Sequence, residues 1–399
     1  MSVHAQPSWF DPKAIETALE RAAAPDSAEL RDILNKSLEL QPLSMEETVA
    51  LMRVQDGVGI GRIMAVADEV KQKVYGDRIV LSAPLHISNH CGSECLYCAN
   101  RKSNKTIERK YMTSPEMRQA ALKLIRQGHK RIFLVSGQLP NADIEYLAEA
   151  ISILYTAFDG VGEVHSVNVN VGALESYEYA ALLDSYVGTM LIYQDTYHEA
   201  SYRAAHVSGP KSDYYARLNA PDVAFQAGVP DVGSGLMLGL GPWQYDLLGV
   251  VQHQAHLLRA YNAGCRTLSL HRMRCAPGSN MQTPYPVSDS EYLRCVAIAR
   301  LAVPYAGIIL TTKEPAGLWR DGCSAGGSQL LTGSVANPYG NWIEDAEQKV
   351  AFPIGEDCMW TKLCAFCLRK PATCRLFVRP VPGWAAVAKT FCPWCANAA

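Results

Sequence analysis

Hydrophobic positions along the chain follow two successive patterns. Residues 1–78 place apolar side chains at helical spacing, in 14–22, 30–40, 49–52 and 60–70, which predicts a helical N-terminal segment. From residue 79 the pattern changes to short, β-branched apolar runs separated by longer amphipathic stretches. Eight runs of this kind occur, at 79–87, 131–136, 164–171, 189–193, 232–239, 267–270, 307–311 and 329–332. We therefore expect eight strands that alternate with helices.

Eight such strands over about 255 residues match the size and element order of a (β/α)8 barrel of the TIM type. One helix is expected at 114–127 with Ser114 as its cap, and another begins at Ser288. An open, doubly wound sheet is the alternative. We divide the chain into a helical N-terminal extension at 1–78, the barrel at 79–335 and a short cysteine-rich segment at 336–399. That last segment is too short to build a large core, so bound metal would have to hold it together.

Charge and hydropathy narrow the class of protein. The 399 residues carry 37 Lys and Arg against 39 Asp and Glu and contain no long basic run, which argues against a nucleic-acid partner. The N-terminus lacks the basic and apolar regions of a signal peptide, and the most apolar stretch, 296–310, is interrupted by Arg300 and Pro304. We expect a cytoplasmic protein that does not enter membranes and acts on a small molecule.

Three of the 13 cysteines follow the first predicted strand in the order C-x3-C-x2-C, at Cys91, Cys95 and Cys98. Structural disulfides are disfavoured in reducing compartments, so metal chemistry is the better interpretation. Three thiolates in one short loop can hold three irons of a cubane cluster and leave the fourth iron open to a ligand. The alternative is a structural zinc site completed by His90. In a barrel this loop lies over the active-site mouth.

The C-terminal segment carries a second cysteine cluster. Cys364, Cys367, Cys392 and Cys395 form C-x2-C…C-x2-C, and Cys358 and Cys374 lie nearby. From the chemistry alone, this spacing suits structural zinc and an iron–sulfur cluster equally well.

The first cysteine loop, with Tyr97 before its last cysteine, resembles the signature of the radical S-adenosylmethionine (SAM) enzymes. That resemblance implies a [4Fe–4S] cluster on Cys91, Cys95 and Cys98, bound SAM, a 5′-deoxyadenosyl radical, and an electron donor such as flavodoxin or ferredoxin. A non-catalytic iron–sulfur scaffold or carrier is the alternative from a different class of function.

Further segments resemble the aromatic amino acid lyase branch of that superfamily, the tyrosine lyases of thiamine synthesis and of [FeFe]-hydrogenase maturation. They are 84–89, 101–105, 193–198, 208–214, 286–289, 302–307 and 336–338. The resemblance implies cleavage of the Cα–Cβ bond of a free aromatic amino acid, L-tyrosine, to dehydroglycine and p-cresol. It also favours an iron–sulfur cluster in the C-terminal segment, and with it carbon monoxide and cyanide formation for a metallocofactor-assembly partner. The alternative is a different small-molecule substrate on the same fold.

The resemblance also implies individual roles. It assigns Tyr97, Gln138 and Arg217 to the cofactor. Asn168 and Asn170 are added from the pattern itself: they alternate with valines on the third strand, so both amides point into the barrel, where either the cofactor or a structural network would satisfy them. Residues expected at the substrate are Gln194, Asp195, Ser269 and Arg272, the last two at the end of the sixth strand, where the lyases hold the substrate carboxylate. Two positions of the substrate region depart from the branch: His86 stands where an aromatic residue is expected, and His271 where a proline is expected. Gln138 also stands where the branch usually carries a glutamate.

Overall fold

Eight parallel strands close into a barrel in the computed structural model, which describes residues 4–138, 143–158, 160, 162–274, 276, 278–279, 281–332 and 375–376. The barrel strands are β1 (Arg78–Ser88), β3 (Arg131–Ser136), β4 (Ser166–Asn170), β5 (Val187–Leu191), β7 (Val232–Leu238), β8 (Thr267–Arg272), β9 (Gly307–Thr311) and β10 (Gln329–Leu331). The last strand pairs with the first through Val80–Gln329, Leu81–Leu330 and Ser82–Leu331. The predicted (β/α)8 barrel is confirmed, and this closure makes the open-sheet alternative wrong.

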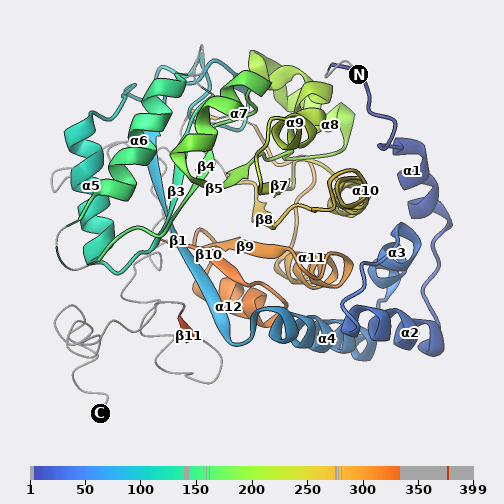
Figure 1. The fold of residues 1–399 in the computed structure, drawn as a ribbon. Coiled ribbons are helices and arrows are strands. Elements are labelled where there is room, and N and C mark those ends of the chain that lie inside the picture. The colour runs from blue at the N-terminus through green and yellow to red at the C-terminus, as the bar shows by residue number, and fades with distance from the viewer. Residues whose placement is uncertain are drawn as a thin grey trace.

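Helices cover the outer face of the barrel (Figure 1). They are α5 (Ser114–Arg126), α6 (Ile144–Thr156), α7 (Ser176–Leu182), α8 (Glu199–Ala205), α9 (Tyr214–Gln226), α10 (Trp243–Tyr261), α11 (Asp289–Ala302) and α12 (Ala316–Ser324), with 3-10 turns at Leu183–Ser185 and Pro210–Ser212. Thr113 rather than Ser114 caps α5: the Glu116 carboxylate accepts from the backbone N–H of Thr113 at 2.8 Å. Ser288 caps α11, as predicted.

Four helices precede the barrel: α1 (Pro12–Arg21), α2 (Ser27–Leu38), α3 (Met45–Arg53) and α4 (Gly57–Tyr75). They lie against α10, α11 and α12 (Figure 1). Ile15, Leu51 and Ile63 belong to the same buried cluster as Val296 of α11 and Leu310 of β9. Because they share this core, the N-terminal helices stabilise one side of the barrel rather than forming a separate body.

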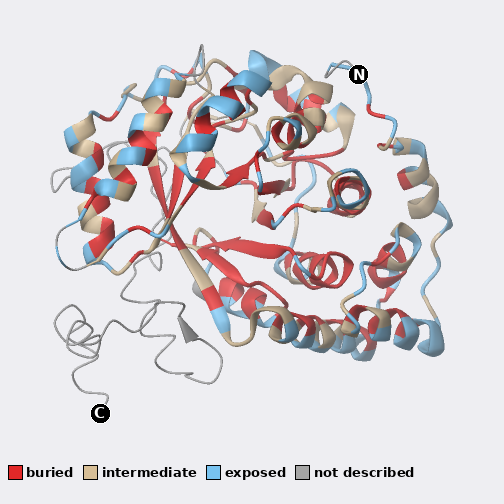
Figure 2. Cartoon of the chain, viewed as in Figure 1, coloured by how far each residue is buried: buried red, intermediate tan, exposed pale blue. Residues whose placement is uncertain are grey.

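Alternating side chains along each barrel strand face either the helices or the interior. On β1, Leu85 and Ile87 pack into the cluster under α5 and α6, so His86 between them faces inward. A separate small cluster of Phe133, Leu191 and Ile309 fills the interior. The strands are buried on both faces (Figure 2), so the barrel is a packed core whose open end is the mouth at the strands' carboxyl ends.

Two short elements lie outside this frame. Strand β2 (Glu94–Cys95) pairs antiparallel with β6 (His206–Ser208), and β11 (Arg375–Leu376) pairs with the start of β1. Apart from β11, the cysteine-rich segment at 336–399 lies outside the described residues. No helix in the described part of the chain is long and apolar enough to span a bilayer.

Candidate active site

The three cysteines of the first loop follow β1 directly, at the mouth of the barrel. Pairing of β2 with β6 holds the middle of the loop, because Cys95 pairs with His206 and the Leu96 N–H donates to the Ala205 carbonyl at 2.9 Å. Backbone N–H groups point at two of the sulfurs: Ser93 donates to Cys91 Sγ and Asn100 to Cys98 Sγ, each at 3.4 Å. Burial raises the pKa of Cys95 to about 12, so this sulfur ionises when a metal takes up the thiolate.

Close backbone contacts fix the path of the loop. A Cβ atom on Gly137 would lie 2.2 Å from the His90 carbonyl oxygen, and one on Gly209, which has φ +86°, would lie 2.3 Å from the Gly92 carbonyl oxygen. The Arg109 guanidinium donates to the carbonyl of Asn100 at 2.9 Å and to three further carbonyls of the same loop. The loop is therefore shaped before any cofactor binds.

His90 does not turn toward the cysteines. Its ring stacks on Tyr111 at a centroid distance of 4.4 Å. Within the described residues, no group of three His, Cys, Asp or Glu side chains has the arrangement of a single-ion site.

Beneath the loop, Tyr97 joins a buried polar network. Its hydroxyl donates to Asp195 Oδ2 at 2.9 Å, lies 2.9 Å from His206 Nε2, and accepts from Lys211 Nζ at 3.2 Å. Lys211 also forms an ion pair with Asp195. Burial acts to raise the pKa of Asp195, but Lys211 and His206 outweigh it and hold that pKa well below its usual range. Asp195 is thus a fixed negative charge, at a φ of +64°, that ties the cysteine loop to the segment after β5.

Three of the residues expected to bind the cofactor carry polar atoms without a partner in the described part of the chain. They are Gln138 Oε1, Asn168 Nδ2 and one terminal nitrogen of Arg217. Each side chain is held at its other end: Gln138 Nε2 donates to Ala173 O at 3.3 Å, Asn168 Oδ1 lies 3.2 Å from Ser166 Oγ, and Arg217 Nε donates to Tyr193 O at 2.7 Å. Buried polar atoms without partners are costly, so each needs a ligand or water.

These observations fit the cofactors that the sequence implies. Three thiols lie in one preshaped loop, which suits a cluster with one open iron. The unpartnered atoms are the Gln138 side-chain oxygen, the Asn168 amide nitrogen and one Arg217 nitrogen. The ammonium group of SAM matches the oxygen, and its carboxylate matches the two nitrogen donors. Asn170, at the end of β4, is half-buried on the same strand face as Asn168.

Ser269 and Gln194, two of the residues expected at the substrate, are both buried but lie in different parts of the barrel. Ser269 is buried on β8 with its side chain toward the barrel interior, next along the strand face to His271. Gln194 is buried after β5, and its Nε2 donates to the Thr196 carbonyl at 3.3 Å. Asp195 lies in the network under the cysteine loop rather than in the interior.

Arg272 lies on the opposite face of β8 from Ser269, turned outward against α11. Its Nε lies 3.2 Å from both carboxylate oxygens of Glu314, and its Nη2 lies 2.5 Å from Oε2. Its Nη1 donates to Asp289 at 2.7 Å and to the Val287 carbonyl at 3.0 Å. The guanidinium also covers the ring of Tyr292 at 5.4 Å. The anion that this arginine meets is therefore a carboxylate of the protein itself.

His271, rather than Arg272, shares the inward face with Ser269, and its ring lies 5.8 Å from that of Tyr193. Burial lowers the pKa of His271 to about 4 and that of His86 to about 3, and the charge of Lys313 lowers both pKa values further. His86 and His271 lie on the inward faces of β1 and β8, and Lys313 follows β9 in the chain. Sequence reasoning noted both histidines as departures and missed Lys313, although its place directly after the β9 run was a usable signal.

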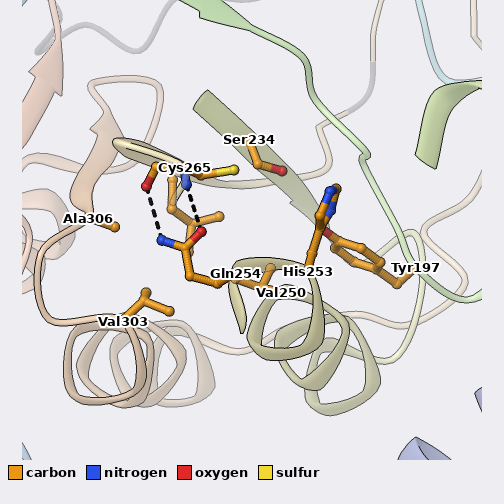
Figure 3. A pocket seen from close by; sticks show the side chains of 9 residues that line it. Tyr197, Ser234, Val250, His253, Gln254, Cys265, Val303 and Ala306 are labelled. Atoms are coloured by element: carbon orange, nitrogen blue, oxygen red, sulfur yellow. Dashed lines mark hydrogen bonds between the residues drawn. The ribbon is translucent and has the colours of Figure 1, made fainter. Parts of the chain in front are cut away.

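A separate small cavity lies on the other side of the barrel wall, between β7, β8 and α10 (Figure 3). Tyr197 and His253 close it, with the Tyr197 hydroxyl 2.9 Å from His253 Nδ1. None of the predicted site residues lines it. Cys364, Cys367, Cys392 and Cys395 lie outside the described residues.

Comparisons with known proteins agree with this geometry. The radical SAM superfamily model matches residues 85–244, and that of the Biotin and Thiamin Synthesis associated domain matches residues 269–366. A structure of HydG, a maturase of the [FeFe]-hydrogenase, superposes with a TM-score of 0.80 at 34% identity, over 83% of this chain and 74% of that one. HydG from Carboxydothermus hydrogenoformans gives 0.85 at 26%, over 97% and 91%. The 2-iminoacetate synthase of Escherichia coli (strain K12) is 25% identical over 283 residues, 70% of this chain and 73% of the synthase.

Proposed function

From the premise that this chain belongs to the radical SAM superfamily, we propose that it is a carbon–carbon lyase that cleaves free L-tyrosine between Cα and Cβ. The products would be dehydroglycine and p-cresol: one hydrogen of tyrosine passes to 5′-deoxyadenosine, and a proton and an electron from the reductant replace it in p-cresol. The observation that carries the proposal is the division of the barrel mouth into a cofactor half and a substrate half. Similarity to HydG along nearly the whole chain and to 2-iminoacetate synthase supports the reaction class.

The cofactor half is built on the cysteine loop, β3, β4 and α9. Cys91, Cys95 and Cys98 would hold three irons of a [4Fe–4S] cluster, and Gln138, Asn168 and Arg217 would use their unpartnered atoms on SAM, with Asn170 and Tyr97 beside them. When bound, the cluster and SAM supply a 5′-deoxyadenosyl radical that abstracts hydrogen from the substrate. This half of the mouth fixes where that radical arises.

The substrate half is built on four consecutive strands of the barrel, β8, β9, β10 and β1. His271 and His86 stand at its two sides, and Lys313 follows β9 between them. Lys313 follows β9, between the strands that carry the two histidines, and we assign it to the substrate carboxylate on its charge and its place at the strand end. Ser269 and Gln194 would complete the wall.

The chain's own contribution to catalysis is positioning and exclusion of water. The apolar plug of Phe133, Leu191 and Ile309 closes the barrel beneath the site. The Asp195–Lys211 ion pair and the Tyr97 hydroxyl fix the position of the cysteine loop at the barrel mouth. Both reactants would therefore be held in one closed space.

We also propose a second iron–sulfur cluster on Cys364, Cys367 and Cys392, with Cys395 as a further candidate ligand. The support is the spacing of these cysteines and the similarity to [FeFe]-hydrogenase maturases. With three ligands, an open iron could take up a fragment of dehydroglycine and release carbon monoxide and cyanide to a metallocofactor-assembly partner. With Cys395 as a fourth ligand, coordination would be closed and the cluster would serve a structural or electron-relay role.

Anaerobic reconstitution with iron and sulfide, followed by mass spectrometry of the products, tests the main proposal. SAM, dithionite and tyrosine should yield 5′-deoxyadenosine and p-cresol in comparable amounts. Formation of 5′-deoxyadenosine without cresol, across a panel of amino acids that includes tyrosine, would point to another substrate. Cluster binding without any SAM cleavage would identify a scaffold or carrier instead.

A further inference from the structure

A largely buried ammonium group lies directly beneath the cysteine loop. Lys211, whose side chain is 17% exposed, pairs with the almost fully buried carboxylate of Asp195 and donates from Nζ to the Tyr97 hydroxyl at 3.2 Å. Its Nζ lies 5.9 Å from the centroid of the Tyr97 ring. Tyr97 stands between Cys95 and Cys98 in the chain. The charge of Lys211 is therefore held against the segment that joins two of the three thiols.

The backbone of Lys211 is held on both sides, which fixes the place of its charge. The Lys211 N–H donates to Ser93 Oγ at 3.1 Å, and the Lys211 carbonyl accepts from the Tyr202 hydroxyl at 2.7 Å. Tyr202 is fully buried, and Ser93, which is also buried, lies in the C-x3-C part of the cysteine loop. Lys211 thus contacts the loop twice, with its backbone at Ser93 and with its side chain at Tyr97.

Two largely buried charges of opposite sign therefore lie against the loop, the Lys211 ammonium and the Asp195 carboxylate. Burial raises the pKa values of the Cys95 and Cys98 thiols; the Lys211 charge acts against that rise, whereas the Asp195 charge adds to it. Of the two charges, the ammonium has the larger effect on each thiol. Because water screens buried charges poorly, both act more strongly on the loop than surface charges would.

We propose that Lys211 sets the reduction potential of the cluster on Cys91, Cys95 and Cys98, with Asp195 as the opposing charge. The cluster is that of the proposed function, on which this inference rests. Reduction adds one negative charge to the cluster, which a fixed cation nearby stabilises and a fixed anion opposes. Net charge and solvent exposure are features by which proteins set cluster potentials. Lys211 therefore favours the reduced cluster, which is the form that cleaves SAM.

A redox titration of the reconstituted full chain, without SAM and followed by the electron paramagnetic resonance signal of the reduced cluster, measures this potential. At the wild-type midpoint, Lys211→Met should lower the ratio of reduced to oxidised cluster about tenfold, a shift of about 59 mV to more negative potential. Asp195→Asn should raise the same ratio at least about threefold. Lys102→Met, at an exposed lysine four residues after Cys98, is the matched control and should change the ratio less than about twofold.

Tyr97→Phe separates the effect of charge from that of structure, because it removes a contact of the loop and keeps both charges. Its ratio should stay within about twofold of the wild-type ratio. Shifts of the same sign in Lys211→Met, Asp195→Asn and Tyr97→Phe would identify a structural role and overturn the inference. An unchanged potential in Lys211→Met would also overturn it.

Iron analysis shows whether each variant keeps its cluster. Where Lys211→Met loses iron, Lys211→Gln takes its place with the same expected fall, and the rise in Asp195→Asn is an independent test. Wild-type protein that holds no four-iron cluster would overturn the proposed function together with this inference. A potential that responds to Lys211 as expected, in a protein that forms no p-cresol, would uphold this inference and overturn the assigned substrate.

Discussion

Arg272 and Glu314 form an ion pair on the outer side of the barrel wall, with Nη2 of the arginine 2.5 Å from Oε2 of the glutamate. Glu314 is almost fully buried, and Arg274 approaches the same oxygen at 2.5 Å. The neighbour of Glu314 in the chain is Lys313, whose charge contributes to lowering the pKa values of His86 and His271. The pair therefore fixes the turn after β9 from the outer side of the barrel wall.

Removing the carboxylate charge should destabilise the protein. Glu314→Gln leaves two guanidinium groups beside a neutral amide, and breaking a buried pair from one side costs about 3–5 kcal/mol. Because Arg274 is partly exposed, we expect the lower end of this range in the free energy of unfolding from denaturant titration. Asp289→Asn, at the exposed end of the same arginine, should cost less than about 1 kcal/mol. Equal costs for the two variants would contradict the structural role of Glu314.

Replacing Lys313 should separate substrate binding from SAM binding. Lys313→Met removes the cation assigned to the substrate carboxylate, so tyrosine affinity should fall at least about tenfold. SAM affinity should stay within about twofold, because the cofactor half lies on other strands. Lys313→Arg retains the charge and should recover most of the tyrosine affinity. Unchanged tyrosine binding in Lys313→Met would remove this residue from the site.

The cysteine loop is expected to hold a cluster that is required for SAM cleavage. Alanine at any one of Cys91, Cys95 or Cys98 should abolish the reduced-cluster electron paramagnetic resonance signal that shifts on SAM addition, and 5′-deoxyadenosine formation with it. Cys265→Ala, a buried cysteine behind the barrel wall, should retain both. A triple alanine variant that cleaves SAM at the wild-type rate is incompatible with the assignment.

Asp246 should make stability depend on pH. It is fully buried at the start of α10, accepts from Thr196 Oγ1 and the Tyr197 N–H at 2.7 Å, and burial raises its pKa to about 7. The folded state therefore binds a proton that the unfolded state has lost above pH 4. The stability that this proton contributes is full below the unfolded pKa and is lost as the pH rises through about 7.

Between pH 5 and pH 8, this carboxyl group should lower the free energy of unfolding by about 2–3 kcal/mol. Asp246→Asn keeps an oxygen for both donors and should flatten that slope when denaturant midpoints are compared across pH. An identical slope in the variant would show that other groups set the pH dependence.

The proposed C-terminal cluster should be needed after the first bond cleavage. A Cys364→Ala/Cys367→Ala variant should lose about half of the protein's iron, because one of two four-iron clusters is removed. It should still form 5′-deoxyadenosine and p-cresol. Loss of about one zinc with iron unchanged would identify the segment as a zinc site instead. Metal analysis of the purified variant decides between the two.

The sequence by itself determined the barrel and the cysteine loop. Period-two apolar runs and amphipathic stretches are local signals, and they located all eight barrel strands within a few residues. Spacing within one loop is also local, so C-x3-C-x2-C predicted a metal site, and its resemblance to the radical SAM signature named the cofactor without knowledge of the fold. Arg217 came from a resemblance and Asn168 from strand alternation, and the structure adds the unpartnered atoms that give these residues a physical reason to bind.

Only the tertiary structure decided which polar side chains share a space. Arg272 and Ser269 lie three residues apart on one strand, and because strand side chains alternate, they face opposite sides of the wall. Glu314, the partner of Arg272, lies 42 positions further along the chain. The Tyr97 hydroxyl meets Asp195 and His206, which lie 98 and 109 positions away. Pairings across such distances depend on barrel closure, which sets strand order and register and leaves no trace in local sequence pattern.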